Sequence, residues 1–213
     1  MQLRITKYNP IYRNALGHYK KDEWTSSSDI GKNFEDGMLM EEEYLRVESN
    51  YWQAYEQLLQ QCAVPFMTVR DLSIHYFYKY KRCPSLTKNS LFLFENIMHV
   101  KENERISGYT LECLFKLALR EGLWCRLQGP NSSYIHFGYD YYTYWGSCID
   151  CDYSFIKKLG LFPEEYESPH MVTGWDEMDE DEKVKCLIVQ NKQNSTNILK
   201  IEKLIRRDLH PWC

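Results

Sequence analysis

The stretch from Leu123 to Trp145, LWCRLQGPNSSYIHFGYDYYTYW, constrains the fold more than any other part of the chain. Two runs rich in aromatic and aliphatic residues flank Gly129-Pro130-Asn131-Ser132, and a cluster of this composition is typical of a turn. The two runs therefore predict a β-hairpin. A hairpin alone is only marginally stable in water, so this one requires a helix or further strands behind it.

The second run, which we expect to be a single strand over 133–145, has one apolar and one polar face. Strand side chains alternate between faces. The odd positions are Ile135, Phe137, Tyr139 and Tyr141, and the even positions are Tyr134, His136, Gly138, Asp140, Tyr142 and Tyr144. Because Tyr is enriched at binding hot spots, we expect the even face to be exposed and to contribute to a partner surface. The alternative, in which this face packs under another element, stays open because Tyr also favours strands.

Two segments have helical spacing. Apolar side chains form one stripe over 41–62, and 108–121 shows the spacing i, i+3, i+4, i+7, i+8 before Gly122, a typical C′ residue. Alternation over 2–8 predicts a strand that ends at Asn9-Pro10, and Trp24-Thr25 is a candidate start of a second strand paired with it.

The remainder of the chain gives shorter signals. Residues 64–74 favour an extended segment, Pro84 to Thr87 breaks the pattern, the period over 91–100 is ambiguous, and 153–159 predicts a short helix stopped by Gly160. Beyond Pro163 and Pro169 come an acidic run over 176–182 and helical patterns. Strands and helices do not alternate regularly, so the fold class is α+β. We expect an antiparallel sheet with covering helices over 1–168 and a helical C-terminal appendage over 169–213.

Composition limits the function classes. The chain has 213 residues, 44% hydrophobic and 26% charged residues, and a net charge of −4, as expected for a globular domain with no direct nucleic-acid binding. No run reaches the ~18 apolar residues of a membrane span, and the first residues lack the apolar run of a secretory signal. We therefore expect a cytoplasmic protein with no membrane partner, whose eight cysteines are reduced.

Two local patterns would carry chemistry. Cys148-Ile149-Asp150-Cys151 has the spacing of a redox pair, but it lacks the β-α-β frame of thioredoxin-like proteins. A zinc site would need two more ligands, and His136, His170 and Cys125 offer no second close pair. His136 and Asp140 would lie about 13 Å apart on one strand unless Gly138 forms a bulge. We expect no metal, cofactor or catalytic residue, and a small enzyme or thiol redox protein using Cys148, Cys151 or His136 is the alternative.

The N-terminal segments LRITKYNP, DEWTSSSDIGKNF and EEEYLRVE, with the later LWCRLQ and YIHFGYDYYTY, resemble small bacterial proteins of the immunity type. Such proteins protect a cell from toxins exchanged between neighbouring bacteria. The resemblance covers about residues 1–168 and implies a cytosolic protein that binds one toxin domain and blocks its active site, with no catalytic residue of its own.

Two groups of residues are the candidates for that contact. If the toxin is a nuclease, its cleft is basic and carboxylates can mimic phosphate. The group on the N-terminal loop consists of Asp22, Glu23, Trp24 and Asp29. The group on the even face of the 133–145 strand consists of Tyr134, His136, Asp140, Tyr142 and Tyr144.

Overall fold

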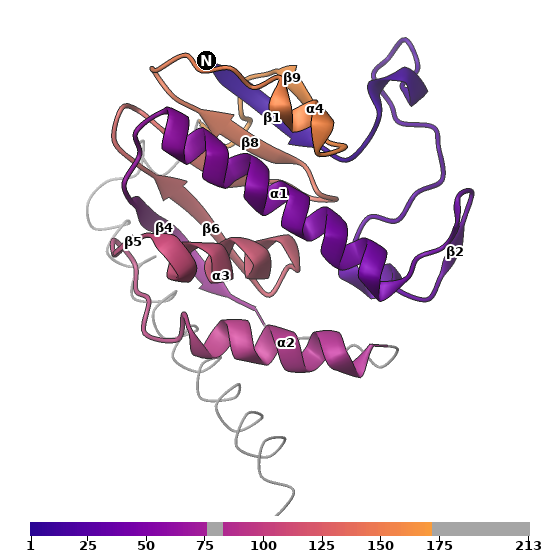
Figure 1. Cartoon of the computed structure of the whole chain (residues 1–213), viewed down its shortest axis with the longest axis horizontal. Helices are drawn as coiled ribbons and strands as arrows, with labels where there is room; N and C mark the ends of the chain where they lie inside the picture. Colours follow the sequence, from indigo (N-terminus) through magenta and orange to yellow (C-terminus); the bar gives the residue numbers. More distant parts are fainter. Residues whose placement is uncertain (76–82, 172–213) are drawn as a thin grey trace, which may run out of the picture.

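A seven-stranded antiparallel sheet forms the centre of the computed structural model, which describes residues 1–75 and 83–171 (Figure 1). The strand order is β5-β4-β6-β7-β8-β1-β9. The strands are β1 (Gln2–Thr6), β4 (Met67–Ile74), β5 (Arg105–Ile106), β6 (Leu123–Gln128), β7 (Tyr134–Phe137), β8 (Thr143–Gly146) and β9 (Phe162–Glu165). A separate short hairpin joins β2 (Asn33–Phe34) to β3 (Gly37–Met38). The predicted α+β class with an antiparallel sheet is confirmed.

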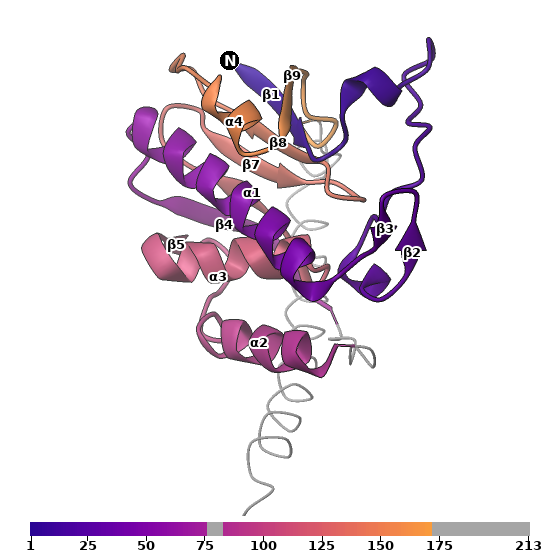
Figure 2. The ribbon, with the colours of Figure 1, turned by 45° about the vertical axis from the view of Figure 1, so that its right-hand side comes forward.

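The helices gather on one face of this sheet. α1 (Glu41–Gln61) and α3 (Gly108–Leu119) lie across it, with α2 (Pro84–Glu95) beside α3 and the short α4 (Phe155–Lys158) near β9 (Figures 1 and 2). Both predicted covering helices are therefore confirmed. Within the described ranges, no helix is long and apolar enough to cross a membrane.

Aromatic rings fill the layer between the sheet and the helices. Tyr55 of α1 meets Trp145 of β8 with ring centroids 6.2 Å apart, and Phe115 of α3 meets Phe137 of β7 at 5.3 Å. Each such ring buries about 150–250 Å². Leu3, Ile5 and Ile135 are fully buried in the same layer. The odd positions within β6 and β7 thus face the core, as expected, whereas Tyr139, expected on the same face, is 85% exposed.

A chain of buried polar groups crosses this apolar layer. Arg120, the C-cap of α3, donates two hydrogen bonds of 2.6 Å to the Glu48 carboxylate of α1 and a third, of 2.8 Å, to Ser90 Oγ of α2. The Tyr44 hydroxyl donates to Glu48 at 3.3 Å, and the Tyr141 hydroxyl donates to Tyr44 at 2.6 Å. All three helices are therefore connected to the loop between β7 and β8.

That loop corrects the expectation of one strand over 133–145. The chain reverses at Tyr139–Tyr142, where the Tyr142 N–H donates to the Tyr139 carbonyl at 3.0 Å. Asp140 and Tyr141 have φ of 55° and 62°, as a type I′ hairpin turn requires. The predicted turn over 129–132 is also of this kind, because Asn131 and Ser132 have φ of 57° and 52°.

Proline explains two further differences. Pro84, read from the sequence as a break, occupies the first turn of α2, where its missing N–H costs nothing. Pro163 lies within β9, an edge strand that tolerates proline. The expected pairing of β1 with a strand at Trp24-Thr25 is wrong. β1 pairs with β8 and β9 instead. The expected helical appendage lies outside the described residues, except for 169–171.

The Glu48–Arg120 pair allows a direct stability test. Glu48→Ala or Arg120→Ala removes one partner of a buried ion pair and should lower the free energy of unfolding by about 3–5 kcal/mol, measured by urea denaturation. The double variant Glu48→Met/Arg120→Met should be less destabilised than either, since no unpaired charge remains. Arg46→Ala, which breaks the exposed pair with Glu43 on the same helix, is the control and should cost less than about 1 kcal/mol. Equal losses for Arg46→Ala and Arg120→Ala would contradict this role.

Candidate functional site

The loop between β1 and α1 departs furthest from regular structure. Over 7–40 its regular structure is limited to two 3₁₀ turns, Pro10–Tyr12 and Ser27–Asp29, the β2–β3 hairpin and an isolated bridge between Arg13 and Tyr19. Its first part stands away from the sheet and helices (Figures 1 and 2). Irregular loops of this length in compact domains are usually functional. Four of the predicted contact residues, Asp22, Glu23, Trp24 and Asp29, lie in it.

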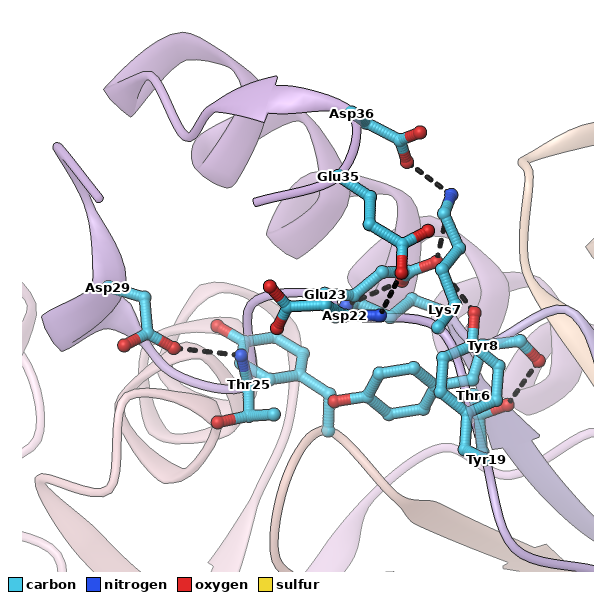
Figure 3. A network of polar contacts seen from close by, with 12 residues as sticks. Thr6, Lys7, Tyr8, Tyr19, Asp22, Glu23, Thr25, Asp29, Glu35 and Asp36 are labelled. Atoms are coloured by element: carbon cyan, nitrogen blue, oxygen red, sulfur yellow. Dashed lines mark hydrogen bonds and ion pairs between the residues drawn. The ribbon is translucent and has the colours of Figure 1, made fainter. Parts of the chain in front are cut away.

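A buried lysine fixes the base of this loop. The Lys7 ammonium donates to Glu23 Oε2 at 3.0 Å and lies 4.1 and 4.2 Å from the ring centroids of Tyr8 and Trp24 (Figure 3). Burial lowers the pKa of Lys7, although the Glu23 carboxylate opposes that shift. An ammonium enclosed by two aromatic faces and one carboxylate is a strong cation-binding arrangement. Sequence reasoning missed Lys7 because nothing in its neighbourhood indicates burial.

Glu23 is the centre of the network drawn in Figure 3. Its second oxygen accepts from the Tyr19 hydroxyl at 2.6 Å and lies 3.4 Å from the Lys21 ammonium, which also pairs with Asp36. Burial raises the pKa of Glu23, but these bonds outweigh it and the pKa is lowered overall. Glu23 is therefore an ionised structural anchor with its oxygens already engaged, and only its half-buried edge is open to a partner.

The other three residues of this group have different environments. Trp24 is buried against the rings of Tyr44 and Tyr141. Asp29 is buried and is the acidic residue of a capping box, in which its carboxylate accepts hydrogen bonds from the Thr25 and Ser26 N–H groups. Burial opposes ionisation of Asp29, but its bond to Lys32 and these N–H bonds lower its pKa. Asp22 is exposed. Of the four residues, Asp22 is the one whose whole side chain is open to a partner.

The tip of the loop exposes two aliphatic side chains on a fixed backbone. Ile11 and Leu16 are 75% and 79% exposed. Asn14 Oδ1 accepts from the N–H groups of Leu16 and His18 at 3.0 and 2.9 Å, and the Asn9 side chain accepts from the Ile11 N–H at 3.1 Å. The turn-forming residues Asn9-Pro10, Asn14 and Gly17 indicate an ordered backbone here, but this segment was predicted only as a polar loop.

The even face of the hairpin is covered. Tyr134, His136 and Tyr144 are 6%, 2% and 7% exposed, so the expectation that they face solvent is wrong. The segment 166–171, which follows β9, crosses this face. His136 Nδ1 and Ser168 Oγ are 2.8 Å apart, and the centroid of the Tyr144 ring lies 6.2 Å from that of Tyr166 and 5.8 Å from that of His170. Buried aromatic and polar groups on this face therefore attach the segment to the sheet.

Two members of the second group remain accessible. Asp140 is exposed at the β7–β8 turn, beside Tyr139, which is 85% exposed. Tyr142 is half-buried between Arg4 and Arg13, and its hydroxyl accepts from Arg13 at 3.3 Å. The turn thus separates His136 from Asp140, and no hydrogen bond joins them in the described structure.

The residues of the alternative chemistry are placed as follows. Cys148 is exposed, whereas burial and the neighbouring Cys62 thiol raise the pKa of half-buried Cys151 to about 12. A redox thiol needs the opposite shift. The His136 ring lies beside the Ser168 hydroxyl, a neighbour that the sequence did not indicate. Both side chains are buried, so neither is open to a substrate. Among residues 1–75 and 83–171, no group of three or more His, Cys, Asp or Glu side chains could hold a metal ion.

Comparisons with family models, curated proteins and solved structures find no match for this chain.

The buried histidine makes stability depend on pH. Burial, with repulsion from Arg126 and His170, lowers the pKa of His136 from 6.5 to about 3. The unfolded chain binds this proton near pH 6.5, whereas the folded protein binds it only near pH 3. The stabilisation is therefore complete above pH 6.5 and is lost as the pH falls, by up to about 1.4 kcal/mol per pH unit.

Urea denaturation at pH 6.5, 5.5 and 5.0 would measure this loss. We expect His136→Gln to be less stable at pH 7 but to have a shallower slope than the wild type. His99→Gln, at an exposed position, is the matched control and should keep the wild-type slope. Identical slopes for the wild type and His136→Gln would show that His136 does not contribute.

Proposed function

We propose that this protein is an immunity-type protein that binds one toxin domain of a bacterial competition system and occludes its active site. The observation that carries the proposal is the tip of the N-terminal loop, where Ile11 and Leu16 are exposed on a hydrogen-bonded backbone. The proposal takes up the expectation, drawn from the sequence alone, that residues 1–168 resemble such proteins.

An inhibitor of this kind needs a rigid surface. Ordering a flexible loop on binding costs affinity, and a loop already held in place avoids that cost. Here the tip is fixed by Asn9 and Asn14, and its base by Lys7, Glu23 and Tyr19. Ile11 and Leu16 would supply the apolar anchors of the contact, and exposed aliphatic groups on a projecting tip suit insertion into a concave active site.

The charges around the loop suit a basic partner. Asp22, Glu35 and Asp36 are exposed on the loop and the β2–β3 hairpin, and Asp140 is exposed on the β7–β8 turn. In this proposal carboxylates steer a basic, nuclease-like cleft toward the apolar tip, acting as phosphate mimics. The inhibitor acts in the cytoplasm, by contact alone and without a cofactor.

The test uses toxin domains encoded next to the gene for this protein. Co-expression of the protein with its cognate domain should restore growth, and the purified pair should form a stoichiometric complex by gel filtration. If no neighbouring toxin domain is bound or neutralised, the proposal is wrong.

The tip should carry the binding energy. Ile11→Asp/Leu16→Asp should weaken the complex at least about ten-fold in calorimetry, because truncated hot-spot residues cost more than 1 kcal/mol. Its melting temperature should stay close to wild type, since both side chains are in solvent. Phe92→Asp is the control, because Phe92 is 53% exposed and belongs to α2, a helix that lies away from the tip of the loop in Figure 1. Equal binding by the tip variant and the wild type would exclude this surface.

The carboxylates should govern association more than dissociation. Asp22→Lys/Asp140→Lys should slow association with a basic toxin domain and reduce its dependence on salt, as measured by stopped-flow kinetics.

A further inference from the structure

A cleft of about 570 Å³ opens where the ends of β4, β6 and β7 meet the end of α3. This volume is in the range of ligand pockets. Its wall is largely aromatic and aliphatic, with a few polar groups: Ser73, His75, Ala118, Glu121, Leu123, Trp124, Phe137, Gly138, Tyr139 and His170. Neither the immunity proposal nor the polar network of the loop uses this cleft.

The aromatic groups of the cleft are held in place. The Trp124 indole N–H donates to the Phe137 carbonyl at 3.3 Å, and the Trp124 ring packs edge-on against the His170 ring at 6.2 Å. The backbone of Tyr139 is fixed by the β7–β8 turn, and its side chain is 85% exposed, so its ring is open to an incoming group. The cleft therefore offers preformed aromatic surfaces.

No lysine or arginine of the described residues pairs with the carboxylates at the cleft, although the His75 imidazole lies beside Glu121. Glu121 lines the cleft and Asp140 follows Tyr139 at its rim, and within 1–75 and 83–171 neither carboxylate makes an ion pair or a hydrogen bond. Asp140 acts on Glu121 electrostatically, since burial and this neighbouring charge together raise the pKa of Glu121. The basic groups that line the cleft are thus the imidazoles of His75 and His170, and no lysine or arginine lines it.

A second cavity, of about 310 Å³, differs from this cleft in that its charged side chains are paired. It lies between the N-terminal loop and α1, and the charged side chains that line it are paired: Lys7 with Glu23, Arg46 with Glu43, and Asp36 with Lys21. Lys7 in particular fills an enclosure of Trp24, Tyr8 and Glu23. The cleft at Glu121 has the same three components, a tryptophan, a tyrosine and a carboxylate, but no lysine or arginine side chain lies among its lining residues.

We propose that this cleft binds the guanidinium or ammonium group of an arginine or lysine side chain of the protein partner. Aromatic faces attract such cations through their quadrupole, and a nearby carboxylate adds a charge-assisted hydrogen bond. The planar guanidinium also stacks on Trp and Tyr rings, which favours arginine over lysine. The inference rests on the proposed function for the source of the side chain and adds the partner's chemistry.

The site can be probed without the partner. The probe is N-acetyl-arginine methylamide, titrated into the ¹⁵N-labelled full-length protein, with the Trp124 indole N–H and the Gly138 and Tyr139 amides as reporters. Its neutral isostere, N-acetyl-citrulline methylamide, is the control. We expect saturable shifts at these reporters with the arginine probe and at least about five-fold weaker binding of the citrulline probe.

Two variants test the named groups. Tyr139→Ala should weaken binding of the arginine probe about two- to five-fold, the range for a cation–π contact at an exposed site. Glu121→Gln, which removes the charge of the hydrogen-bonding carboxylate, should weaken it at least about two-fold. Both positions are on the surface, so the fold should persist. Glu42→Gln and Tyr109→Ala, at exposed positions on α1 and α3, are the matched controls and should bind like the wild type.

The outcomes separate this inference from the proposed function. Equal binding of the two probes, or unchanged binding in Glu121→Gln and Tyr139→Ala, would overturn the cation site whatever the toxin experiments show. Selective arginine binding with no neutralised toxin domain would support the cation site and overturn the immunity function.

Discussion

The ion pair between Glu48 and Arg120 is the interaction on which the arrangement of the helices depends. Both side chains are almost completely buried, at 2% and 1% exposure. Two charges removed from water at this depth are tolerated only when nearly every donor and acceptor is satisfied. Ser90 and Tyr44 meet that requirement from α2 and from the preceding turn of α1. The pair therefore fixes the relative positions of three helices, which apolar packing alone would leave less specific.

The same polar chain reaches the β7–β8 turn. A tyrosine with positive φ is unusual, because its Cβ is strained in the left-handed region, at a cost of about 1–3 kcal/mol. Tyr141 keeps this conformation because its hydroxyl donates to Tyr44 and its carbonyl accepts from the Tyr51 hydroxyl at 2.7 Å. Its ring also packs against Trp24, so the turn and the base of the N-terminal loop share one aromatic cluster. Packing in the core thus stabilises a strained segment at the surface.

The elements that could be predicted from the sequence are those with a regular apolar period or a typical turn composition. The apolar stripes of α1 and α3 and the turn at Asn131-Ser132 follow from spacing and composition alone. The turn between β7 and β8 was missed because Asp140-Tyr141 lacks the glycine or asparagine that usually marks positive φ. The turn is stabilised instead by Tyr44 and Tyr51, which are distant from it in sequence. β9 was missed since an edge strand tolerates proline, which in a central strand would argue against pairing.

The candidate site was less predictable than the fold for a related reason. Alternation correctly grouped Tyr134, His136 and Tyr144 on one face, but it cannot tell whether another segment covers that face, and Ser168 lies 32 positions from His136. Likewise, the charges of Glu23 and Asp29 were visible, whereas their partners Lys7 and Lys32 become apparent only when the loop is folded. Residues chosen for their charge or aromaticity were therefore often structural.

Buried side chains fix the positions of the exposed residues of the N-terminal loop and of the β7–β8 turn. Because Tyr141 turns inward to reach Tyr44, the preceding Tyr139 and Asp140 must turn outward at the tip of the same type I′ turn. Because Lys7 is enclosed by Glu23 and two rings, the chain after it leaves the sheet in a fixed direction, and the loop that carries Ile11 and Leu16 begins from a rigid base. A partner that contacts both the loop and the turn would meet surfaces connected through one buried cluster of Trp24, Tyr44 and Tyr141. This connection lets a small domain present two separate loops in one constant geometry, and binding with little reorganisation requires that property.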